Sequence, residues 1–124
     1  MSKFLRAVRG ATTLDEDSKE EVFFKTQELL SELLKQNSLI QDDVVSIIFT
    51  ATPDIVSAFP ATAARMMGLD DTPLLGAMEQ NVLGSPSLCI RMLMHCYLDI
   101  PKNLVHHVYL HGAVLLRPDL KSSS

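Results

Sequence analysis

The sequence predicts an α/β or α+β domain built on one mixed sheet. Strand-like and helix-like segments alternate in the first half of the chain, and strand-like segments dominate the second half. The chain has 124 residues, of which 47% are hydrophobic and 21% are charged, a composition typical of a globular protein with a single core. We therefore expect one domain over residues 1–120 and a disordered tail over 121–124.

The chain begins with a predicted strand and a predicted helix. Residues 3–9 alternate between apolar and polar side chains, which predicts a strand that ends at Gly10. Ser18 and Glu21 have the spacing of a capping box, and the apolar residues after them recur at helical intervals. We expect this helix to end at Asn37, a residue common at helix ends.

A second strand and a short second helix follow. Residues 44–51 are rich in β-branched residues and apolar on both faces, which is typical of a central strand covered by a helix. Residues 60–68 form the predicted helix, with Pro60 in its first turn and Gly68 just past its end.

The second half of the chain contains a long strand between less regular segments. Residues 74–81 are expected to be short and irregular, and residues 89–98 to form the long strand. Residues 104–112 and 113–119 are two β-rich runs that are interrupted only at Gly112.

Composition and charge exclude several classes of partner. Fifteen Asp and Glu against eleven Lys and Arg give a net charge of −4, so we expect no nucleic-acid partner. No apolar run approaches the ~20 residues that span a bilayer, so we expect no membrane partner. Arginines interrupt the start of the chain where a secretory signal needs an apolar core. Cys89 and Cys96 would face opposite sides of one strand and could not bridge each other, so we expect a reducing, cytoplasmic location.

Histidines near the C-terminus raise the question of a metal site. His107 and His111 would share one face of a strand, but Gly112 breaks the pattern and no acidic ligand flanks them. Hydrogen-bonded or exposed histidines are the better interpretation. We therefore expect no metal.

Arg91 interrupts an apolar strand, and a buried guanidinium needs a partner. An internal ion pair with Glu79 is one explanation, and an anionic ligand is the other. Four arginines lie in or beside ordered segments, namely Arg9, Arg65, Arg91 and Arg117. One carboxylate cannot neutralise all of them, so we expect a small polycarboxylate as the ligand.

Four stretches of the chain, taken together and in order, resemble one family. They are "RAVRGATT", "ATPDIVSAFPATAAR", "CIRMLM" and "HVYLHGAVLLRPDL". Over almost its whole length the chain resembles the trimeric chorismate mutases of the pseudo-α/β-barrel type. The resemblance implies a homotrimer with active sites at subunit interfaces, which rearranges chorismate to prephenate in phenylalanine and tyrosine biosynthesis.

The resemblance also implies roles for particular residues. Arg9, Arg91 and Tyr109 would contact the carboxylates and the ether oxygen of the substrate, and Glu79 would hold its hydroxyl group. The adjacent subunit would contribute Phe59, Ala61 and Arg65, Cys89 would line the pocket, and Leu116 and Arg117 would form the mobile edge of the cleft. The chain departs from the family pattern at Gly76, where a cysteine is usual, and at Met78, where a glutamine is usual. We expect these departures to alter affinity or pose and to leave the reaction unchanged.

The implied reaction fits the absence of familiar catalytic motifs. A rearrangement within one molecule needs no nucleophile, proton transfer or cofactor, and the sequence has no nucleophile elbow and no phosphate-binding loop. Two alternatives stay open at this point. One is a trimeric small-molecule-binding protein or an imine or enamine deaminase of similar fold. The other is a catalytically silent member that senses an aromatic metabolite.

Overall fold

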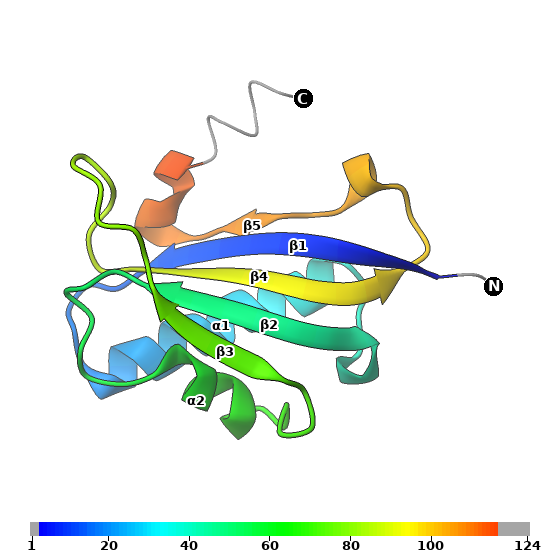
Figure 1. Ribbon diagram of the computed structural model, residues 1–124, viewed down its shortest axis with the longest axis horizontal. Coiled ribbons are helices and arrows are strands. Elements are labelled where there is room, and N and C mark those ends of the chain that lie inside the picture. The colour runs from blue at the N-terminus through cyan, green and yellow to red at the C-terminus, as the bar shows by residue number, and fades with distance from the viewer. Residues whose placement is uncertain (1–2, 117–124) are drawn as a thin grey trace.

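The computed structural model describes residues 3–116 (Figure 1). The expected tail at 121–124 and the candidate residue Arg117 lie outside the described residues. The helices and strands are β1 (Phe4–Thr13), α1 (Lys19–Gln36), β2 (Val44–Ala51), α2 (Pro60–Met66), β3 (Leu74–Met78), β4 (Cys89–Leu98) and β5 (Val108–Tyr109). None of the helices in this part of the chain is long and apolar enough to cross a membrane.

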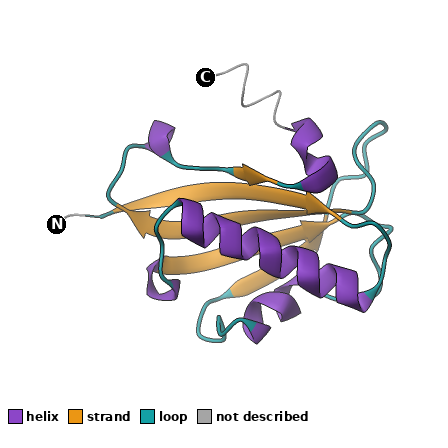
Figure 2. Cartoon of the chain, turned by 180° about the vertical axis from the view of Figure 1, so that it is seen from behind, coloured by secondary structure: helices purple, strands orange, loops and turns teal. Residues whose placement is uncertain are grey.

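The strands form one mixed sheet in the order β3-β2-β4-β1-β5. Strand β4 runs antiparallel to β1 and β2, while the pairs β2–β3 and β1–β5 are parallel. Both helices lie on the same face of the sheet, which is plain when the chain is seen from behind (Figure 2). The prediction of an α/β domain with one mixed sheet is confirmed.

Helix α1 covers the centre of the sheet and begins and ends where the sequence predicts. The Ser18 side chain accepts a hydrogen bond from the Glu21 N–H, and Asn37 caps the other end. Leu29, Leu30 and Leu33 are fully buried against the apolar face of the sheet. Burial of each leucine contributes about 1.5–3 kcal/mol to stability.

Strand β1 does not end at Gly10, as predicted, but continues to Thr13. A Cβ atom at Gly10 would lie 2.9 Å from Leu33 Cδ1 and 3.2 Å from Leu29 Cδ1. The glycine is therefore required by the close approach of α1 to the strand, not by a turn. As a result Ala11 remains in register with β4 and β5.

Two other predictions of secondary structure are wrong. Residues 74–78 are not irregular but form the edge strand β3, parallel to β2. The run 113–119 was expected to be β-rich, whereas His111–Leu116 is a 3₁₀ helix. The backbone turns away from the sheet at His111, whose φ is 53°, and the Gly112 N–H donates to Thr13 Oγ1 at 2.8 Å. Both cysteines are buried and free, as expected for the two faces of one strand.

Candidate active site

Backbone register places the candidate residues in a row across the sheet. Arg91 on β4 pairs with Thr50 on β2 and with Ala11 on β1. Ala11 pairs in turn with Tyr109 on β5. Glu79 follows the end of β3, where its N–H donates to the Ala51 carbonyl at 2.9 Å. Pairing of all five strands therefore positions the side chains that the site uses.

Four predicted site residues line a cavity of ≈ 370 Å³. We call it the cationic cavity; its lining residues are Arg9, Gly10, Ala11, Ile48, Thr50, Glu79, Arg91, Met92, Leu93 and Tyr109. The structure thus brings Arg9, Glu79, Arg91 and Tyr109 together from three strands and a loop.

Arg91 and Glu79 form an ion pair inside this cavity. Arg91 Nε lies 3.4 Å from Glu79 Oε1, and the Thr50 hydroxyl donates a hydrogen bond to the same carboxylate oxygen. The Arg91 side chain is nevertheless 32% exposed, and that of Glu79 is 18% exposed. The internal ion pair and the open cavity therefore coexist, and Arg91 can contact a ligand without leaving Glu79.

Arg9 supplies a second positive charge at the same place. Its guanidinium lies 6.0 Å from the centre of the Tyr109 ring, within reach of a cation–π interaction. One carboxylate faces two guanidinium groups in the cavity, so a dianionic ligand would be favoured electrostatically.

Cys89 and Leu116 lie beside the cavity and are not among its lining residues. Cys89 is buried where its N–H donates to Thr52 Oγ1 at 2.9 Å. Burial raises the pKa of its thiol, and the Arg91 charge opposes that shift only in part. Leu116 packs on a small cluster that contains Ala11 and Tyr109, which places it at the border of the site.

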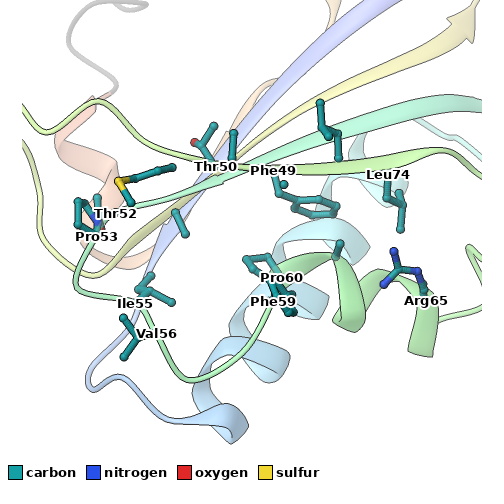
Figure 3. Close-up of a pocket in the computed structure, with 16 residues that line it drawn as sticks. Phe49, Thr50, Thr52, Pro53, Ile55, Val56, Phe59, Pro60, Arg65 and Leu74 are labelled. Carbon is teal, nitrogen blue, oxygen red and sulfur yellow. The ribbon is translucent and has the colours of Figure 1, made fainter.

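The three residues expected to come from an adjacent subunit lie elsewhere in the chain. Phe59, Ala61 and Arg65 line a larger hollow of ≈ 620 Å³, bounded by β2, β3, the 52–59 loop and α2 (Figure 3). Arg65 and Leu74 lie at one end of this apolar hollow, and Thr52 and Pro53 at the other. Phe59 is 77% exposed.

Both departures from the family pattern face this apolar hollow. Gly76 and Met78 are among its lining residues. A Cβ atom at Gly76 would meet nothing within 4 Å, so the glycine leaves space there rather than relieving a contact. Neither residue takes part in the Arg91–Glu79 ion pair.

Sequence reasoning missed two residues that organise these regions. Thr50 lines both the cavity and the hollow and bonds to Glu79. Asp17 accepts hydrogen bonds from the N–H groups of Val56 and Ser57 and from the Ser57 hydroxyl, which hold the loop before Phe59. These bonds, that of the Ser57 hydroxyl above all, lower the pKa of the Asp17 carboxyl. A polar residue inside the apolar run 44–51 was the one available signal for Thr50.

The rings of His95, His107 and His111 each have a hydrogen-bond partner. His107 Nδ1 accepts the Arg9 N–H at 2.9 Å, and His111 Nε2 lies 2.8 Å from Glu28 Oε1. Within residues 3–116, no three His, Cys, Asp or Glu side chains are grouped so that they could hold a metal ion.

Comparison with known proteins relates this chain to enzymes of one activity. The family model "Chorismate mutase type I" matches residues 5–120. The chain is 45% identical over 120 residues to chorismate mutase AroH of Thermus thermophilus, covering 96% of this chain and 98% of that protein. It is 40% identical over 117 residues to chorismate mutase AroH of Bacillus subtilis, with 94% and 92% covered. A solved chorismate mutase from Clostridium thermocellum superposes with a TM-score of 0.86 at 47% identity, covering 88% of this chain and 97% of that one.

Proposed function

This chain belongs to the chorismate mutase type I family and converts chorismate to prephenate, and we propose that it does so in the cationic cavity, completed by a second subunit. The observation that carries this proposal is the presence of two arginines, Arg9 and Arg91, in the lining of one cavity. The deaminase alternative requires only one such group and has no support from the family match.

The reaction rearranges bonds within one molecule, so the protein has two tasks. It must hold the flexible, doubly anionic substrate in its folded conformer, and it must stabilise the negative charge that develops on the ether oxygen. A guanidinium held on a paired strand has its charge in place before the transition state forms. Arg91, which is paired on both sides in the sheet, meets this requirement.

We assign each residue a role that its contacts support. Arg91 donates to the ether oxygen and to one carboxylate, because a planar fork can serve two acceptors. Arg9, beside Tyr109, binds a carboxylate. Glu79, between Arg91 and the Thr50 hydroxyl, accepts a hydrogen bond from the substrate hydroxyl, and it transfers no proton.

Assembly as a homotrimer would complete the cavity. Strands β1 and β3 expose large apolar side chains, including Leu5 and Leu75. An exposed apolar surface of this kind is typical of a subunit interface. Phe59 and Arg65 lie outside the cationic cavity of their own chain, so in this proposal they complete the cavity of a neighbour.

Mixed trimers test the shared site. Arg91→Ala and Arg65→Ala would each be inactive or weak alone, because each lacks one half of every site. Co-expressed in equal amounts with different tags and assayed at a chorismate concentration below the wild-type KM, they should regain about one quarter of the wild-type rate, since about one site in four receives both intact halves. Loss of chorismate absorbance measures the rate, and sedimentation measures the assembly.

Arg9→Ala mixed with Arg91→Ala is the matched control. Both residues line the cavity of the same chain, so no mixture of these two variants contains an intact site, and activity should not return. Recovery in the control, or none in the Arg65–Arg91 mixture despite exchanged subunits, would contradict a site shared in this way.

A further inference from the structure

Strand β5 is too short to hold its place through the sheet alone. It consists of Val108–Tyr109, which pair with Gly10 and Ala11 of β1, and it lies along the outer edge of the sheet (Figure 1). Yet this two-residue strand delivers Tyr109 to the cationic cavity. Other contacts must therefore fix the segment.

Two side-chain interactions anchor the residues just before β5. The buried Asn37 amide donates to the His106 carbonyl and accepts the His106 N–H, both at 2.9 Å. One residue further on, His107 Nδ1 accepts the N–H of Arg9 at 2.9 Å. The imidazole ring thus extends the β1–β5 pairing by one hydrogen bond, and it makes that bond to the backbone of a cavity residue.

We propose that His107 is a positioning residue for the rearrangement, whose neutral ring holds the Arg9 backbone so that Arg9 and Tyr109 meet the substrate together. The proposal rests on the site assigned above. His107 does not line the cationic cavity, so it acts through Arg9 and not on the substrate.

The bond requires one protonation state of the ring. Nδ1 accepts a proton only when it carries none, so the ring must be the neutral tautomer with its proton on Nε2. Basic groups surround the ring, namely Arg6 and Arg9 on β1, His95 on β4, Lys102 in the 3₁₀ helix Lys102–Leu104, and the adjacent His106. Protonation would remove the acceptor and add a positive charge to this group.

Burial, and then the Arg9 charge, lower the pKa of His107 from its ordinary value of 6.5. Because the folded pKa lies below the unfolded one, the bond contributes its full stability above pH 6.5. That contribution is lost as the pH falls through the folded pKa. Catalysis that depends on the bond should therefore fail on the acid side only.

Three variants separate positioning from structure. His107→Leu removes the acceptor and should lower kcat/KM for chorismate by about tenfold to a hundredfold, as expected when a binding group is displaced. His107→Asn keeps an oxygen near the position of Nδ1 and should stay within about threefold of wild type. His106→Leu is the matched control, because His106 is held through its backbone, and it should behave as wild type.

The pH profile gives a second readout. As the pH falls below 6.5, wild type should lose kcat/KM on the acid side, whereas His107→Asn should lack that limb because an amide does not titrate there. Equal impairment of the Asn and Leu variants, an unchanged His107→Leu, or an acid limb that persists in His107→Asn would each overturn the proposal.

An NMR measurement distinguishes failure of the His107 proposal from failure of the site assigned above. A ¹⁵N–¹⁵N coupling across the hydrogen bond between the Arg9 amide and His107 Nδ1 should appear at neutral pH and vanish on acidification. If the coupling is present and Arg91→Ala is inactive but His107→Leu is fully active, the bond is structural only. If Arg91→Ala keeps full activity, the site assignment fails, whatever the coupling shows.

Discussion

The cationic cavity and the apolar hollow are built from different kinds of structure. Arg9, Arg91 and Tyr109 lie on strands whose register is fixed by neighbours, and Glu79 is tied to β2 by its own N–H. The hollow takes Phe59 from a loop and Arg65 from the seven-residue helix α2.

This difference suggests that the cavity and the hollow serve different roles, charge stabilisation and enclosure of the substrate. Charge stabilisation needs groups that do not move during the reaction, and paired strands supply them. In the proposed trimer, the hollow would instead help to enclose the substrate of a neighbouring subunit, and Phe59, an exposed aromatic residue on a loop, suits that purpose. Substitutions of the charged side chains in the cavity should therefore act mainly on kcat, and those near the hollow mainly on KM.

Removal of Arg91 should have the largest effect of any single substitution. Arg91→Ala should lower kcat by about a hundredfold to a thousandfold, the range seen for loss of one preorganised donor to a developing oxyanion. Arg91→Lys should restore little, because an ammonium cannot reproduce the planar fork. Steady-state kinetics on chorismate would measure both.

Arg6→Ala is the control for Arg91, since it removes the same type of charge outside the cavity, where Arg6 donates to the Ile100 carbonyl. Near-normal turnover in Arg91→Ala, or an equal loss in Arg6→Ala, would show that the cavity does not supply the charge.

Glu79→Gln should come next, with kcat/KM reduced by about tenfold to a hundredfold. The amide keeps the size of the side chain but loses the charge that holds Arg91 at 3.4 Å and accepts the substrate hydroxyl. Thr50→Val, which removes only the hydroxyl donor to Glu79, should cost less. Full activity in Glu79→Gln would show that Glu79 is a loop residue with no role in the reaction.

Helix α1 and strands β2 and β4 were predictable because each has a local signal. The Ser18–Glu21 cap and the apolar spacing after it predicted α1, and β-branched runs predicted β2 and β4. Gly10 was misinterpreted because a close helix approach and a turn leave the same residue in the sequence. Strand β3 was missed because it is an exposed edge strand with a central glycine.

The site was less accessible to prediction from pattern than the fold. Arg91 was recognisable as a charged residue in an apolar strand, but the other site residues were identified only through the family resemblance. Thr50, Ala11 and Tyr109 join Arg91 through a register that connects strands far apart in the chain. No local pattern encodes that register. For the same reason the sequence does not identify Arg9 as the hydrogen-bond partner of His107.

Removal of the Tyr109 hydroxyl should have a smaller effect than removal of the charge of Arg91 or of Glu79. Tyr109→Phe should raise KM by about fivefold, as expected for the loss of one hydrogen bond worth about 1 kcal/mol. Tyr97→Phe is the matched control, because Tyr97 is an exposed tyrosine of β4 outside the cavity. An unchanged KM for Tyr109→Phe would assign the ring to packing alone.

The hollow should give the smallest effect, through Asp17. Asp17→Ala removes three hydrogen bonds that hold the loop before Phe59, so KM should rise about twofold to threefold while kcat stays unchanged. Glu16→Ala removes the same charge from the adjacent exposed position and should change neither constant. Because these bonds lower the pKa of Asp17 below 3.8, the loop should stay held until the pH falls through that lowered value. A fall in kcat at constant KM in Asp17→Ala would mean that the loop, like the sheet, takes part in charge stabilisation, and the division between the two regions would be wrong.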